Sequence, residues 1–394
     1  MLNNQILIEN WFEKQWDTHP PLITGSVDLR YCGYKLSPVD TNVFPAGFNN
    51  LDPSVYPLCK KVLKTLLAPR YPECKKILLI PESHTRNAFY FENIHVLSEL
   101  IHAAGYEVRV GSLLSLKHPK MIELNNGKTL NIEPIIRNHT ILTLENFSPD
   151  LIILNNDLCE GVPDILFNIT QPILPRLDMG WFTRRKTHHF TLYEKLATEL
   201  AHLIEIDPWF INPLFTYHEN VDFINLKNNH DLEGQLLEKV AILLENIQKK
   251  YTQYHITEKP FVVIKSDSGT YGMAVMMIQN AQALLTLNRK QRLQMSVGKG
   301  KQKVSNLIIQ EGIPTIDRID NFTCEPVIYM LGQTVVGAFN RVHPNKSATE
   351  NLNSRGMHFV PLKNIEYAHS VVARIAHLAA TLESEQTGGQ PCLN

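Results

Sequence analysis

The chain has 394 residues, of which 44% are hydrophobic and 20% are charged. This composition is typical of a folded globular protein with about two or three domains. Lysine and arginine number 38 and aspartate and glutamate number 39, which leaves a formal net charge of −1. Such a balance provides no global field to hold a polyanion, so it argues against a nucleic acid or a membrane surface as partner.

The N-terminus and the cysteines bear on the cellular compartment. The stretch Met1–Trp16 carries acidic residues among its apolar ones and has no basic head, so it does not resemble a signal peptide. No window approaches the ~18 consecutive apolar residues of a membrane span. The six cysteines are scattered without a CxxC pair, which favours reduced thiols over a zinc cage or a disulfide framework. We therefore expect a cytoplasmic protein.

The first part of the chain divides into an irregular segment and a β-α-β pattern. Residues up to ~70 are rich in Pro, Asn and Asp, and we read no helical or strand period in Gly25–Pro53. A long non-periodic stretch in a compact protein is more often functional than idle. The apolar run Lys75–Glu82 then predicts a buried strand, followed by a helix, a second strand at Val108 and a third parallel strand at Asp150–Asp157. Residues ~70–175 therefore predict a small doubly wound α/β domain.

The second half changes from helices to short strands. The second half of the basic-aromatic segment 181–204 and residues 236–250 predict helices. From 261 to 343 short β runs alternate with Gly-containing turns, and Gly332-Gln333 predicts a hairpin between two of them. A last amphipathic helix covers 368–382. We predict an α/β fold with an α+β C-terminal half, divided into residues 1–175, 176–260 and 261–394.

The sharpest local feature is the sequence KSDSGTYGM at residues 265–273. A buried strand ends on Lys265, and a loop of small residues and glycines returns directly into another β run. Converging backbone N–H groups beside a lysine suit a phosphate. The pattern is neither a Walker A loop nor a GxGxxG turn, and an ordinary tight turn is the competing interpretation.

Residues further along strengthen the phosphate interpretation. Gln310, Glu311 and Gly312 end a buried strand, where backbone groups can bind an adenine edge and a carboxylate can reach a ribose. The hairpin that follows begins near Glu325 and ends at Arg341, and oxygen ligands with an arginine suit Mg²⁺ and a transferring phosphoryl group. Together these features predict an ATP site.

The order of these elements resembles the ATP-grasp superfamily, and four longer stretches resemble the proteobacterial ATP-grasp type of glutamate-cysteine ligase. The stretches are SVDLRYCGYKLSPVDTNVFPAGFNNL (26–51), IPESHTRN (80–87), KSDSGTYGM (265–273) and ENLNSRGMHFVPL (350–362). The resemblance implies an ATP-grasp fold with an N-terminal Rossmann-like substrate domain. It also implies that ATP phosphorylates the γ-carboxylate of glutamate and that the amine of cysteine attacks the acyl phosphate, in the first step of glutathione synthesis.

The resemblance guides the site assignments. We assign Lys265 and Arg341 to catalysis, and ATP with Mg²⁺ as cofactors. The expected nucleotide-binding residues are Lys186, Lys265, Ser268, Gly269, Thr270, Tyr271, Gly272, Gln310, Glu311 and Gly312. The expected metal ligands are Glu325, Glu350 and Asn353. Because the chain lacks the late E-x-N pair of many ATP-grasp enzymes, Asp320 also stays open as a ligand, and each carboxylate has a solvated surface acid as its alternative.

The amino-acid pocket needs cations for the carboxylates and acids for the amine. Two sequence groups provide them: the non-periodic N-terminal run, and the segment just past a parallel strand, where ligands of open α/β sheets bind. The candidates are Asp28, Arg30, Lys35, Asp40, Asn42, Glu82, His84, Thr85, Arg86, Asn87 and Arg185. For Asp28 and Arg30 the alternative interpretation is that they cap the backbone of a loop. For the Arg184–Lys186 run it is a solvated basic face. We expect His84 to form a hydrogen bond rather than to act as a base.

Two other functions stay open at this point. Another ATP-grasp amino-acid or peptide ligase, such as a glutathione-synthetase-like enzyme, would keep the ATP site and change the amino-acid pocket. A non-catalytic nucleotide-binding scaffold would keep only the fold. A homo-oligomer is compatible with the sequence.

Overall fold

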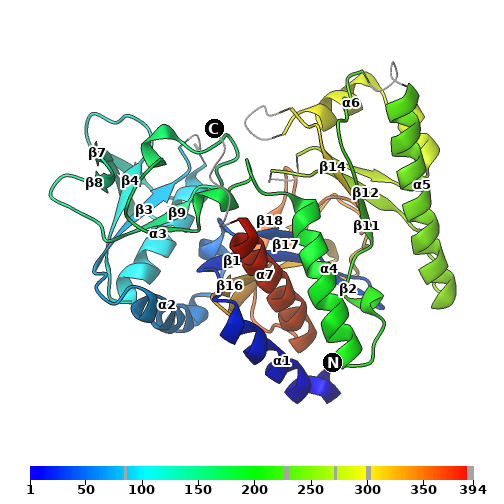
Figure 1. Cartoon of the computed structure of the whole chain (residues 1–394), viewed down its shortest axis with the longest axis horizontal. Coiled ribbons are helices and arrows are strands. Elements are labelled where there is room, and N and C mark those ends of the chain that lie inside the picture. Colours follow the sequence, from blue (N-terminus) through cyan, green and yellow to red (C-terminus); the bar gives the residue numbers. More distant parts are fainter. Residues whose placement is uncertain (84–86, 226–229, 270–272, 299–302, 388–394) are drawn as a thin grey trace.

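A computed structural model describes residues 1–83, 87–225, 230–269, 273–298 and 303–387 of the chain (Figure 1). It has an α/β unit on one side, a central antiparallel sheet backed by helices, and a smaller antiparallel sheet on the other side. Within the described residues, no helix combines the length and the apolar character needed to cross a bilayer. No disulfide joins the cysteines of this part of the chain.

The α/β unit contains the predicted parallel strands. β3 lies between β4 and β9 and pairs parallel with both, and α3 connects β3 to β4, which confirms the β-α-β pattern. The sheet order is β10-β9-β3-β4-β6-β5. The elements of the unit are α2 (Tyr56–Arg70), β3 (Lys76–Pro81), α3 (Ala88–Ala103), β4 (Glu107–Ser112), β5 (Lys120–Glu123), β6 (Thr129–Pro134), β7 (Ile136–Asn138), β8 (Ile141–Thr143), β9 (Leu151–Asn155) and β10 (Ile173–Leu174).

The central sheet joins the two ends of the chain. Its order is β18-β17-β16-β1-β2, with β1 antiparallel to both β16 and β2. The predicted hairpin at Gly332-Gln333 connects β16 to β17. The strands are β1 (Thr24–Tyr31), β2 (Leu36–Asn42), β15 (Arg318–Ile319), β16 (Phe322–Leu331), β17 (Thr334–His343) and β18 (His358–Leu362).

The expectation of an irregular N-terminal segment is wrong. Helix α1 (Gln5–Thr18) precedes β1 and β2, and α2 follows them. The sequence of β1 does alternate, with Val27 and Leu29 on one face and Asp28 and Arg30 on the other, but all of these side chains are largely covered by protein. The three-part domain division stays a prediction, and the pairing of β1 with β16 places this N-terminal segment in a sheet with the C-terminal half.

One face of the central sheet is covered by helices. Val27, Leu29, Ile328 and Ala338 lie in one hydrophobic core with apolar side chains of α1, α4 (Lys186–Leu203) and α7 (Tyr367–Thr387). Figure 1 shows α7 and α4 over this sheet. Because neighbouring residues of a strand point to opposite faces, the polar residues between these apolar ones face away from the helices.

The smaller sheet has the order β11-β14-β12-β13 and is antiparallel throughout. Its apolar face packs on α5 in a core that includes Ile264, Leu307 and Ile309. The elements of this part are β11 (Phe215–His218), α5 (His230–Gln253), β12 (Val262–Ser266), β13 (Val275–Ile278), α6 (Arg289–Ser296) and β14 (Leu307–Glu311).

A buried charge network fixes the start of α4 to its surroundings. The Arg184 guanidinium donates through Nε to both carboxylate oxygens of Glu383 at 2.9 Å and through Nη1 to the carbonyl of Thr41 at 2.7 Å. Both charged side chains are 1% exposed. Burial raises the pKa of Glu383, but Arg184 and His189 outweigh it, so the net pKa lies below its usual range. The network therefore joins α7 to β2 while both charges are kept.

We expect Glu383→Gln to lower the free energy of unfolding by about 3 kcal/mol, because it leaves the Arg184 charge buried without its counter-charge. Urea titration followed by circular dichroism measures this change. Glu385→Gln is the matched control two residues along the same helix, since the Glu385 side chain is 40% exposed and its ion pair among the described residues is with His19. We expect it to cost less than about 0.5 kcal/mol. Equal losses in the two variants would contradict the role of the network.

Candidate active site

A pocket lies between the smaller sheet and the polar face of the central sheet, and we call it the inter-sheet pocket. From the smaller sheet it is bordered by apolar side chains of β12 and β13 and by polar ones of β12 and β14. From the central sheet it is bordered by a row of charged residues. Its lining residues are Asp28, Arg30, Val39, Asp40, Val263, Lys265, Val275, Met277, Gln310, Glu311, Ile313, Glu325, Arg341, Thr349, Asn351 and Asn353.

Lys265 is the cation on the smaller sheet. Its Nζ donates to Gln310 Oε1 and to the carbonyl of Val39, both at 2.6 Å. Burial lowers the pKa of Lys265 to about 8, although Asp40 acts in the opposite direction. Gln310 is 1% exposed, and its Nε2 has no hydrogen-bond partner among the described residues. A buried amide donor and an ammonium group thus border the pocket together, which suits an acceptor-rich ligand.

Arg341 lies at the centre of the charged row on the central sheet. Its Nη1 is 2.9 Å from Asp28 Oδ2 and 2.6 Å from Glu325 Oε1. The other Glu325 oxygen accepts from Arg30 Nε at 2.6 Å. Burial raises the pKa of Glu325, but Arg30 and Arg341 outweigh it and hold the pKa below its usual range. The buried Nε of Arg341 has no partner in the described part of the chain.

Asp28 and Asp40 are cross-strand neighbours on β1 and β2. Asp40 Oδ1 accepts from Lys186 Nζ at 2.6 Å and from the Thr41 amide at 3.1 Å. Within the described residues, Asp28 Oδ1 and Asp40 Oδ2 have no hydrogen-bond partner. Burial raises the pKa of Asp28, whereas Lys186 and Lys265 outweigh burial and lower that of Asp40. Each carboxylate thus keeps one oxygen for a ligand.

A second pocket continues along the same face of the central sheet, and we call it the sheet-face pocket. It shares Asp28, Asp40, Arg341 and Asn353 with the inter-sheet pocket. Its other lining residues are Ser26, Asn42, Ala46, Asn50, Val327, Tyr329, Phe339, Met357 and Phe359. A ligand in one pocket therefore lies directly beside a ligand in the other.

Three predicted residues make close contacts within the protein. Lys35 and Glu311 form a fully buried ion pair of 2.7 Å, and Glu311 also accepts from the Trp209 indole at 3.0 Å. The Glu311 carboxylate is therefore occupied by protein groups, although Glu311 borders the inter-sheet pocket, and Lys35 lines neither pocket. Gly312 is required by packing, because an added Cβ would lie 2.1 Å from the Phe261 ring.

One predicted carboxylate, that of Glu350, and the described residues of the second sequence group also lie outside the two pockets. The Glu350 carboxylate accepts from Lys346 and from the Ser347 amide, both at 2.8 Å, and so stabilises the loop of residues 346–350. Asn87 is the N-cap of α3, and the Glu82 amide donates to the Tyr90 hydroxyl. Neither Glu82 nor Asn87 lines the pockets around Lys265 and Arg341. His84, Thr85, Arg86, Thr270, Tyr271 and Gly272 lie outside the described residues.

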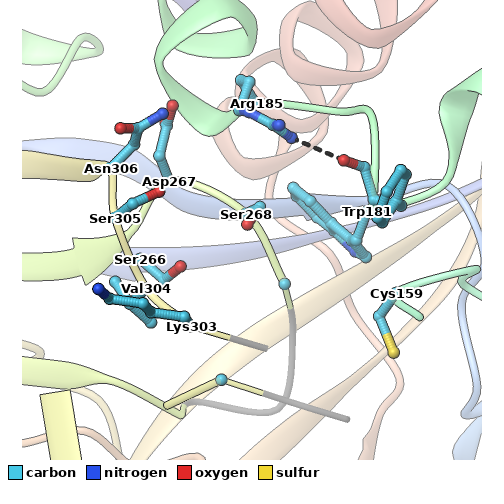
Figure 2. Close-up of a pocket in the computed structure, with 13 residues that line it drawn as sticks. Cys159, Trp181, Arg185, Ser266, Asp267, Ser268, Lys303, Val304, Ser305 and Asn306 are labelled. Atoms are coloured by element: carbon cyan, nitrogen blue, oxygen red, sulfur yellow. Dashed lines mark hydrogen bonds between the residues drawn. The ribbon is translucent and has the colours of Figure 1, made fainter. Parts of the chain in front are cut away.

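A third cavity borders the start of the glycine loop (Figure 2). It is lined by Ser268 and Gly269 together with Trp181, Arg185 and Cys159. The Arg185 guanidinium donates to the carbonyls of Phe182, Thr183 and Arg184 within its own loop. Arg185 therefore stabilises the turn before α4 as well as bordering this cavity, away from the other predicted amino-acid ligands.

Several pocket residues were missed by the sequence analysis. Ser26 and Asn50 lie in the N-terminal run that we considered functional as a whole, and the alternation along β1 predicts that Ser26 shares a face with Asp28. Tyr329 and Phe339 lie in runs predicted as strands, and Phe359 lies in the 350–362 stretch that carries the resemblance, but none of the three is among the predicted site residues. Aromatic side chains in strands usually indicate core packing, so the sequence carries no separate signal for them.

Comparison with known proteins identifies one family over most of the chain. A family model described as Glutamate-cysteine ligase matches residues 1–384. The crystal structure of a candidate gamma-glutamylcysteine synthetase from Methylobacillus flagellatus is 44% identical with a TM-score of 0.90, over 98% of this chain and 95% of that chain. D-alanyl-alanine synthetase A from Vibrio cholerae is 7% identical with a TM-score of 0.37, over 79% of this chain and 81% of that chain. D-cycloserine synthetase DcsG is 12% identical with a TM-score of 0.42, over 79% and 82% respectively. A search of curated proteins finds no match.

We expect the affinity of the protein for ATP to fall as the pH rises through about 8, because the Lys265 ammonium then loses its proton and its charge. The fall approaches tenfold per pH unit at most, and calorimetric titration with a non-hydrolysable ATP analogue at pH 7, 8 and 9 measures it. Lys265→Arg keeps a positive charge over this range, so we expect its profile to be flatter. The same decline in both proteins would show that another group titrates.

Proposed function

The chain belongs to the glutamate-cysteine ligase family, and we propose that its inter-sheet pocket binds ATP while the sheet-face pocket receives an amino-acid substrate. The activity is the ATP-dependent ligation of glutamate to cysteine, which yields γ-glutamylcysteine, ADP and phosphate. The fold is of the ATP-grasp type, with two antiparallel sheets that border one cleft. The observation that carries the proposal is the wall of Asp28, Asp40, Arg341 and Asn353, which belongs to both pockets.

The reaction needs positioning and charge neutralisation more than it needs a nucleophilic side chain. A glutamate γ-carboxylate oxygen attacks the terminal phosphorus of ATP, ADP leaves, and an acyl phosphate forms. The cysteine amine then bonds to the carbonyl carbon of this acyl phosphate while the bond from that carbon to the phosphate oxygen breaks. Of the two protons that the ammonium group loses, one goes to the departing phosphate and one to water. Cations beside the transferred group stabilise its negative charge.

The described residues divide these tasks in our proposal. Lys265 holds the nucleotide phosphates from the smaller sheet, and Arg341 faces the transferred phosphoryl group from the central sheet. The Arg341 Nη1 is held by both Asp28 and Glu325, so the guanidinium needs little reorganisation during the reaction. The apolar side chains of Val263, Met277 and other residues on this side of the pocket provide a slot for the adenine ring.

We propose Asp28 and Asp40 as the protein ligands of Mg²⁺, with Asn353 beside them. Both aspartates keep an oxygen without a partner among the described residues, whereas both oxygens of Glu325 are occupied by arginines. No cluster of three or more His, Cys, Asp or Glu suited to a metal occurs in the described part of the chain. This agrees with Mg²⁺ bound by one or two carboxylates, with phosphate oxygens and water completing its shell. Bound there, Mg²⁺ would neutralise charge on the phosphates.

The proposed function also bears on where in the cell the protein works. We propose a cytoplasmic location, since ATP and free amino acids are the substrates of this activity. A homo-oligomer remains a prediction from the sequence.

The proposal is tested by measuring ADP release from the purified protein with ATP, Mg²⁺ and pairs of amino acids. We expect turnover with glutamate plus cysteine, none with γ-glutamylcysteine plus glycine, and a loss of at least about 100-fold in kcat/KM for ATP in Lys265→Ala. Lys303→Ala, at an exposed lysine outside the inter-sheet pocket, is the control and should retain activity. Turnover with γ-glutamylcysteine plus glycine would support a glutathione-synthetase-like ligase, and ATP binding without any turnover would support a scaffold.

A further inference from the structure

The sheet-face pocket has a polar wall and an aromatic wall. The polar wall is made of Asp28, Asp40 and Arg341 with the amides around them. The aromatic wall is a chain of rings, in which the Phe339 centroid lies 5.4 Å from that of Tyr329 and 4.9 Å from that of Phe359. A pocket of this kind suits a small ligand with a charged end and an apolar, polarisable end.

Phe359 is the ring that a ligand in this pocket can reach. It lies on the edge strand β18, is 37% exposed, and is the cross-strand neighbour of Arg341. Met357 also lines the pocket. Sulfur packs favourably on the edges of aromatic rings, and a thioether adds a polarisable contact. The aromatic wall therefore has the chemistry of a thiol pocket, placed next to the charged row.

The charges of the pocket distinguish the two amino acids. Glutamate carries two carboxylates and needs cations for both, whereas cysteine is a zwitterion with one. The lining residues include two carboxylates and a single guanidinium, and Arg341 is already paired with Asp28 and Glu325. The second carboxylate of a bound glutamate would thus lie against aromatic rings, because Arg341 is the one cation among the described residues that line the pocket. Cysteine fits this pocket better than glutamate does.

We propose that the sheet-face pocket is the cysteine subsite of the ligase, with the thiol against Phe359, Phe339 and Met357. The inference rests on the proposed function, in which the adjoining pocket holds ATP. The ammonium end of cysteine then lies toward the shared wall of Asp28, Asp40, Arg341 and Asn353, beside the phosphorylated γ-carboxylate. Phe359 acts as a specificity-determining residue that selects a thiol over a hydroxyl.

The test uses Phe359→Ala and Phe359→Leu in the full chain, assayed with saturating ATP and Mg²⁺. The control is Phe322→Ala on β16, a ring that is 41% exposed in the same sheet and does not line the pocket. Cysteine and serine serve as acceptors, and the melting temperature of each variant establishes that it is folded. Phe359→Leu keeps apolar volume while it removes the ring, so it separates an aromatic contact from simple packing.

We expect Phe359→Ala to lower kcat/KM for cysteine by roughly three- to tenfold, to leave KM for glutamate and ATP unchanged, and to reduce the preference for cysteine over serine. Phe359→Leu should show a smaller change in the same direction, and Phe322→Ala none. A rise in KM for glutamate with cysteine unaffected would overturn the inference and assign the pocket to glutamate. Equal behaviour of the folded Phe359 and Phe322 variants would also overturn it. Absence of turnover by the unmodified protein with glutamate and cysteine would instead contradict the proposed function.

Discussion

The ion pairs of Arg341 are the interaction on which the arrangement of the site depends. Through a single guanidinium nitrogen, Arg341 on β17 contacts Glu325 on β16 and Asp28 on β1. Buried charges are costly unless they are paired and hydrogen-bonded, so these three residues fix the mutual positions of their strands at the cleft. The strands come from opposite ends of the chain, and the pairing of β1 with β16 is what places Asp28 in the site.

The start of α4 connects this charged row to the smaller sheet. The Lys186 side chain reaches Asp40 on the central sheet, while its amide donates to the carbonyl of Asp267, in the loop after Lys265, at 2.7 Å. Thr187 donates to the Asp267 carboxylate through its amide at 2.8 Å and through its hydroxyl at 3.0 Å. One helix terminus thus holds both walls of the cleft, and the Arg184–Glu383 pair fixes that terminus to α7.

The sequence predicts the chemistry of this site better than its geometry. Lysine at a strand end, a small-residue loop and a late arginine predict a nucleotide site. Lys265 and Arg341 do meet in one pocket, whereas Ser268 and Gly269 line the separate cavity beside Trp181. Residue type alone does not tell which carboxylates stay available, because that depends on long-range partners. Glu311 and Glu325 are both buried and acidic, but the first is satisfied by Lys35 and Trp209 and the second by two arginines. Strand β1 was missed because polar residues that face a cleft were interpreted as loop residues.

In the proposed site, one wall of the cleft serves both the phosphoryl donor and the amino-acid substrate. This arrangement is tested by a crystal structure of the protein with a non-hydrolysable ATP analogue and Mg²⁺. We expect the terminal phosphate within hydrogen-bonding distance of Lys265 and Arg341, with the metal about 2.1 Å from oxygens of Asp28 and Asp40. A nucleotide bound instead in the cavity beside Cys159 and Trp181, or a metal held by Glu350 far from Asp28, would contradict it.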